Sequence, residues 1–294
     1  MQKNIKSKKI CVYLCLSVVS FFVLISPLLA QTKPLIKRTT YKTETIEFGA
    51  GLVSIVGAPN GSITIEGWRK NEVEISADIE IQAENEADLN QLAPVNTFVL
   101  DEGFGHIRIT SVGTHDKKYL KRMARKFPKS FLALPFRIDY RIKVPSFCDI
   151  EIDGGRGVLN LSNVEGAMRV NFLETNATLN LAGGMLNATI GKGNVEVVIP
   201  NGNWRGRFAD VQLADGNLTV QMPQNLNAEI NAKILRIGKI KNSFAALKPY
   251  DRTKFTEQSI MAKAGNGGAK LNFTVGDGTL TIKNQELKIK NSEN

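Results

Sequence analysis

The chain has 294 residues, of which 43% are hydrophobic, 22% charged and 7% aromatic, and its formal net charge is +10. This apolar content excludes an intrinsically disordered chain, and 25 glycines without a Gly-X-Y period exclude a collagen helix. Three cysteines and two histidines are too few for a disulfide framework or for a zinc site built without carboxylates.

Residues 1–30 have the organisation of a secretory signal peptide. Residues 1–9 contain four lysines and no acid, and an apolar run follows over residues 10–25. Cleavage would follow Ala30, although Leu28 stands where a small residue is preferred, so an uncleaved anchor over residues 11–30 is the alternative. We therefore expect an exported protein of the periplasm or cell surface, with membrane association as an open possibility.

Removal of residues 1–30 would leave a formal charge of +6 and a single cysteine, Cys148. Such a chain has no internal disulfide, so its stability must come from a hydrophobic core. We expect Cys148 to be a small buried hydrophobe rather than a reactive thiol.

Residues 31–145 read as an N-terminal β region with two helical insertions. Apolar residues alternate with polar ones over residues 73–81 and 138–144, which is typical of strands with one buried face. The first insertion lies near residues 83–93 and ends at Pro94. The second lies near residues 116–128 and is strongly basic.

On this second insertion, Tyr119, Leu120, Met123 and Phe127 fall on one side of a helix that Pro128 would end. Two roles remain open for it: binding an anionic membrane surface, or covering the open end of a stack of strands. The cations on its other side, which are the candidate anionic-surface residues, are Lys117, Lys118, Lys121, Arg122, Arg125 and Lys126.

Residues 146–294 contain short aliphatic strands that recur every seven to eleven residues, with glycine-rich turns between them. Such short strands bury few residues each, so neighbours must stack into a continuous core, which predicts a β-solenoid, or β-helix. Residues 239–264 are less regular and predict an excursion from the stack. Asn-X-Thr sequences at Asn176, Asn187, Asn217 and Asn272 are interpreted as turn chemistry.

Three segments carry a family resemblance: FRIDYRIKVP (136–145), DIEIDGGRGVLNLSNVEGAMRV (149–170) and DGNLTVQMP (215–223). Together with GDGTLTIK (276–283) and residues 87–109, they resemble the DUF4097-type adhesin family of secreted bacterial β-solenoid domains. The resemblance implies an all-β solenoid, an adhesin-like domain over residues 146–294 and a role in adhesion. It brings no catalytic residues, and the basic insertion departs from the family pattern.

Five cations of the solenoid could line one face and meet anionic glycans or lipid headgroups: Arg156, Arg169, Lys192, Arg205 and Arg207. No catalytic, cofactor-binding or metal-binding residue is assigned, because His106 and His115 are better interpreted as surface or turn residues. The absence of a basic groove interleaved with aromatic residues argues against nucleic acid as a partner.

The sequence thus predicts an exported, non-enzymatic cell-envelope protein that presents a β-solenoid surface to an envelope protein, a glycan or a membrane. A self-assembling structural solenoid is the alternative, followed by a glycan-active β-helix enzyme. The oligomeric state is left open.

Overall fold

The computed structural model describes residues 34–122, 128–200 and 204–285. The described residues from Ile36 onward belong to one compact unit. The predicted fold class, an all-β solenoid, is confirmed. The expected signal segment, residues 1–30, lies outside the described residues, and none of the helices described has the length and apolarity needed to cross a membrane.

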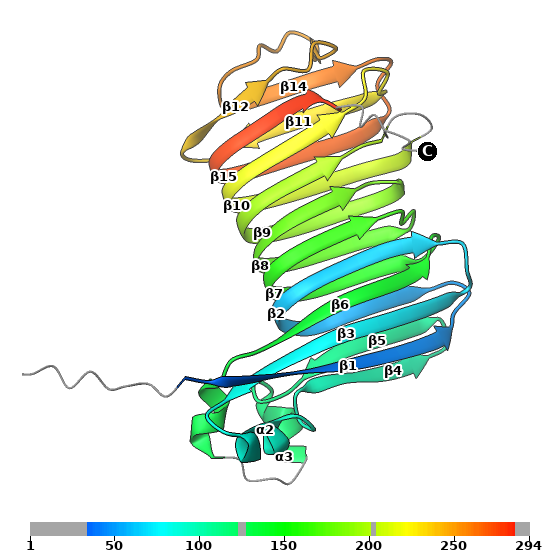
Figure 1. The fold of residues 1–294 in the computed structure, drawn as a ribbon. Helices are drawn as coiled ribbons and strands as arrows, with labels where there is room; N and C mark the ends of the chain where they lie inside the picture. Colours follow the sequence, from blue (N-terminus) through cyan, green and yellow to red (C-terminus); the bar gives the residue numbers. More distant parts are fainter. Residues whose placement is uncertain (1–33, 123–127, 201–203, 286–294) are drawn as a thin grey trace, which may run out of the picture. The chain divides into compact units, whose positions relative to one another are not determined.

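The solenoid consists of long strands that each make one coil and pair in parallel with the next (Figure 1). Paired positions of β7 and β8 are 18 residues apart, and those of β9 and β10 are 23 apart from Phe208 onward. The unequal steps explain why the sequence shows no strict period. The coil strands are β2 (Leu52–Trp68), β7 (Asp149–Ser162), β8 (Ala167–Asn180), β9 (Gly183–Val198), β10 (Arg205–Met222) and β15 (Ala269–Asn284).

A column of glycines bends these strands halfway along. Gly193, Gly216 and Gly278 are in register, with φ between 135° and 138°, a backbone conformation that glycine adopts readily. Strand pairing continues on both sides of the bend. The short strands expected from the sequence are therefore the two halves of single long strands.

The halves before the glycine column form one sheet, which we call the leading sheet, and the halves after it form the trailing sheet. The separation is visible at the N-terminal end of the stack, where β5 (His106–Val112) pairs only with the first half of β2 and β6 (Phe136–Pro145) only with its second half. The core lies between the two sheets, because alternate residues such as Phe273 and Leu280 are completely buried.

Thr175 takes the place of a glycine in this column, since it pairs in register with Gly157. It is 2% exposed, and its Oγ1 is buried without a hydrogen-bond partner among the described residues. We expect Thr175→Val to raise the free energy of unfolding by about 1 kcal/mol, because it removes an unsatisfied polar group at nearly constant volume. Urea unfolding measures the change. Thr175→Ser, which keeps the hydroxyl, is the control and should give no gain; equal behaviour of the two variants would contradict the argument.

Further strands extend both sheets at the N-terminal end, first in parallel with β2 and then antiparallel to one another. β6, β3 (Glu72–Ala83) and β1 (Ile36–Glu47) continue the trailing sheet, whereas β5 and β4 (Thr97–Gly103) continue the leading sheet. Because β2 pairs in register with β7, the first coil precedes residue 146, where the solenoid was expected to begin.

Three short helical segments lie between these N-terminal strands. α2 (Glu86–Leu92) lies within the first expected insertion; the side chain of Asn85 caps its N-terminus and its Leu89 and Leu92 are buried. α3 (Lys117–Arg122) has six residues, none of them buried. It lies within the helix expected near 116–128, of which residues 123–127, with Met123 and Phe127, lie outside the described residues. The 3₁₀ segment η1 (Lys129–Ala133) follows Pro128.

The C-terminal end is closed by a cap with an unusual strand order. β11 (Ala228–Ile234) and β12 (Gly238–Asn242) make a coil beyond β10, and β13 (Lys248–Pro249) and β14 (Ser259–Ala264) add antiparallel strands to it. The chain then returns, and β15 inserts between β10 and the β11–β12 coil (Figure 1). The irregular residues 239–264 thus form most of this cap.

Candidate functional site

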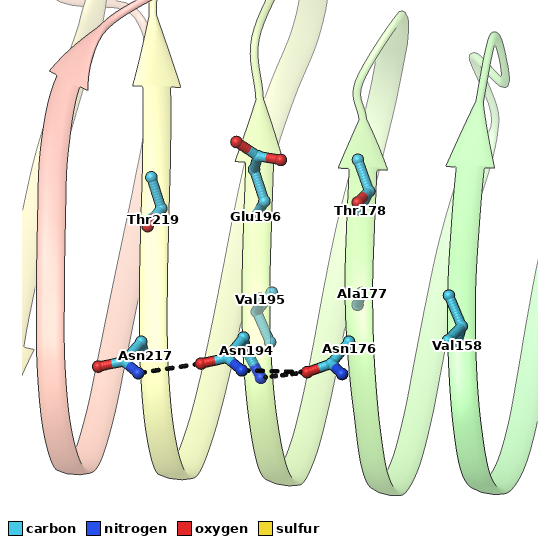
Figure 2. A pocket seen from close by; sticks show the side chains of 9 residues that line it. All are labelled: Val158, Asn176, Ala177, Thr178, Asn194, Val195, Glu196, Asn217 and Thr219. Atoms are coloured by element: carbon cyan, nitrogen blue, oxygen red, sulfur yellow. Dashed lines mark hydrogen bonds between the residues drawn. The ribbon is translucent and has the colours of Figure 1, made fainter.

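An open groove of 340 Å³ crosses four coils on the outer face of the trailing sheet, from β7 to β10. Figure 2 shows two rows of outward side chains along it. It is lined by Val158, Asn176, Ala177, Thr178, Asn194, Val195, Glu196, Asn217 and Thr219.

The first row is an asparagine ladder. Asn217 donates from Nδ2 to Oδ1 of Asn194 at 2.9 Å, and Asn194 donates from its Nδ2 and its backbone N–H to Oδ1 of Asn176, both at 3.2 Å. Each amide has two N–H donors and two acceptor lone pairs. The ladder therefore orders the three amides and leaves donors and acceptors directed at solvent, about 4.8 Å apart from strand to strand.

The second row consists of Thr178, Glu196 and Thr219, which follow the asparagines by two residues on the same strands. Gln221 donates a hydrogen bond to the Glu196 carboxylate and fixes its position. Hydroxyls, amides and one carboxylate form a surface that can both give and accept hydrogen bonds. Such a surface suits sugar hydroxyls, because each of them also donates and accepts hydrogen bonds.

Sequence analysis missed this site because it interpreted the Asn-X-Thr sequences as turns. Asn176, Asn187, Asn217 and Asn272 instead lie within β8, β9, β10 and β15. In a strand, residues i and i+2 point to the same face, so Asn-X-Thr places both polar side chains outward while the middle residue enters the core. The alternation of polar and apolar residues is visible in the sequence and could have indicated outward-facing polar side chains. The register between strands, which brings those side chains together, is not visible there.

The five solenoid cations do not share one face. Arg156 and Lys192 lie near the bend, Arg169 is on the outer face of the leading sheet, and Arg205 and Arg207 lie exposed at the start of β10. Three of the five have acidic partners on neighbouring coils: Arg156 with Glu174 at 3.3 Å, Arg169 with Glu151 at 3.0 Å and Lys192 with Asp215 at 3.4 Å. These acids reduce the positive potential that a row of free arginines would produce.

On the basic insertion, Lys117, Lys118, Lys121 and Arg122 are exposed, and the last three line an open groove. Arg125 and Lys126 lie outside the described residues. Among the strands described, β1 and β4 are the edges of the two sheets at this end. Strands rather than α3 therefore form these two edges, and both roles considered for the insertion, membrane binding and capping, stay predictions.

The two histidines and Cys148 occupy structural positions. His106 Nε2 lies 3.3 Å from Ser54 Oγ, and His115 stacks on Phe136 with ring centroids 5.1 Å apart. Burial lowers the pKa of His115, and burial raises the pKa of the Cys148 thiol to about 12, which keeps it protonated at neutral pH. Among the described residues, no group of three or more His, Cys, Asp or Glu side chains could hold a metal ion.

No protein-family model matches this chain. No curated protein sequence matches it either. Among solved structures, it is similar to a candidate cell adhesion protein from Clostridium sporogenes, with 14% identity and a TM-score of 0.47 over 84% of this chain and 100% of that one. It is also similar to a candidate adhesin from Bacteroides fragilis, with 13% identity and a TM-score of 0.34 over 86% of this chain and 98% of that one. At these values neither likeness identifies a family or a partner for this chain.

Proposed function

We propose that this chain is an exported, non-enzymatic binding protein of the cell envelope, and that the groove on its trailing sheet holds an extended, hydroxyl-rich glycan. The observation that carries the proposal is the asparagine ladder of Asn176, Asn194 and Asn217, which repeats the same amide on three successive coils. A regular spacing of identical polar groups suits a polymer of regular repeat better than a compact small molecule.

The open groove also fits binding better than catalysis. Glu196 is the one titratable residue that lines it, whereas hydrolysis or elimination of a glycan commonly uses an acid and a base together. Affinity would be distributed over several coils, each contributing a few exposed hydrogen bonds. Adhesion is the natural use of such a surface in an exported protein.

The rival function, self-assembly into filaments, needs solenoid ends that can stack. Here antiparallel strands end both described sheets at the N-terminal end and the leading sheet at the C-terminal end, where β12 is the edge of the trailing sheet. The edge strand β1 carries Lys37, Arg38 and Lys42, charges of the kind that discourage pairing of strand edges. A mass that increases with concentration in analytical ultracentrifugation would favour the rival.

The groove is tested by affinity electrophoresis of residues 31–294 in gels containing dextran, laminarin or methyl-esterified polygalacturonate. We expect retardation by at least one of these neutral polymers, and Asn194→Ala should weaken it about tenfold, the equivalent of one or two hydrogen bonds. Asn187→Ala is the matched control, because it removes an exposed asparagine from the same strand on the opposite sheet. Equal effects of the two variants, or no retardation by any polymer, would contradict the proposal.

A further inference from the structure

The two polar rows of the groove continue in register beyond β10. Asn217 is paired with Thr279 on β15, which is paired with Lys239 on β12. Thr219 is likewise followed by Thr281 and then by Lys241. Parallel strands in register place paired side chains on the same face, so both lysines lie on the outer face that carries the asparagine ladder.

Both lysines are available for a ligand. Lys239 and Lys241 are exposed on either side of the buried Ile240, and neither side chain has an ion-pair or hydrogen-bond partner in the part of the chain that the structure describes. Residues 228–270 hold nine basic and three acidic residues, whereas residues 31–227 hold 22 of each. The cap is therefore a positively charged end of an otherwise balanced stack.

The cap differs from the rest of the stack in ion pairing as well. Ten of the eleven ion pairs among the described residues join partners between residues 36 and 215. Arg236 makes the remaining pair, with Asp277 at 2.5 Å, and is thereby neutralised. Lys239 and Lys241 are left as a pair of free ammonium groups two strands, or about 10 Å, beyond Asn217 and Thr219.

We propose that the polymer held by the groove is an acidic polysaccharide, and that Lys239 and Lys241 bind its carboxylate groups while the asparagine ladder binds its hydroxyls. The inference rests on the proposed function, because it extends the same surface. A linear glycan lying across the coils would pass over both parts. Glu196 lies three strands, or about 14 Å, from β12, so its charge opposes a carboxylate at the lysines only weakly.

The test compares polygalacturonate with its fully methyl-esterified form, which shares the backbone and lacks the charge. Binding of residues 31–294 is measured by biolayer interferometry at low and at physiological salt. We expect the acidic form to bind about tenfold more tightly at low salt, with the preference decreasing as salt screens it. Lys239→Gln with Lys241→Gln should abolish the preference and leave binding of the ester unchanged.

The matched control is Lys248→Gln with Lys263→Gln. These exposed lysines are paired across β13 and β14, in the same cap and with the same change in charge, but on the strands that continue the leading sheet. The control variant should keep the preference for the acidic polymer. If both double variants lose it equally, or if the wild-type protein shows none while the ester still binds, the lysine assignment is overturned and the groove stands. If neither form binds while dextran or laminarin still retards the protein, the acidic-polymer assignment is overturned and the groove stands. If none of these polymers binds, or if Asn194→Ala weakens the binding of none, the groove itself is overturned.

Discussion

Replacing Gly216 by alanine is expected to destabilise the solenoid by more than about 3 kcal/mol. A Cβ on Gly216 would lie 1.9 Å from the carbonyl oxygen of Gly193 on the adjacent coil, and φ of 135° is strained for any residue with a side chain. Such strain costs about 1–3 kcal/mol by itself, and the clash is with backbone that cannot rotate away. Because Gly278 makes the same approach to Gly216, two coils would have to shift together.

Gly49→Ala is the control for this experiment, since a Cβ there would meet nothing within 4 Å. We expect the control to unfold at the wild-type urea concentration and Gly216→Ala to unfold at a much lower one, or to be recovered only as aggregate. Similar midpoints for the two variants would show that the bend tolerates a side chain, and the glycine column would then lose its role in directing each strand from one sheet to the other.

The sequence predicted the fold class because strand alternation and glycine spacing are local. Each half-strand, such as Leu159 with Leu161, shows the period of two on its own, and a glycine lies before it. Local signals could not show that pairing continues through the bend, because a turn between two strands and a bend within one strand have the same composition. The long strands became visible only when neighbouring coils were aligned.

The site was less predictable, because its residues are brought together by register. Arg156 and Glu174 are 18 residues apart, as are Asn176 and Asn194, but the next step in the ladder, to Asn217, is 23. Without knowledge of that register, the arginines were interpreted as unpaired cations and the asparagines as turn residues. The position of Lys239 is harder still to predict from the sequence. Its strand, β12, is joined to the groove only by β15, which comes later in the chain.

Deletion of residues 269–294, which include β15, is expected to unfold the cap. β15 lies between β10 and the β11–β12 coil, so its loss would leave these strands about 10 Å apart with no partner between them. Five of its side chains have no exposed surface and contact the central core: Leu271, Phe273, Val275, Leu280 and Ile282. Burying even two of them contributes several kcal/mol.

Hydrogen exchange of the truncated chain distinguishes the cap from the coils. We expect amides of β11, β12 and β14 to exchange as in an unfolded chain, while those of β7 and β8 stay protected, because neighbouring coils support one another locally. A synthetic peptide of residues 269–284 should restore protection in the cap, and the same peptide with Phe273→Asp should not. A cap that stays protected without β15 would contradict the expectation. Rescue by the peptide would show that the cap, and with it the lysine pair of β12, assembles only once β15 has been inserted.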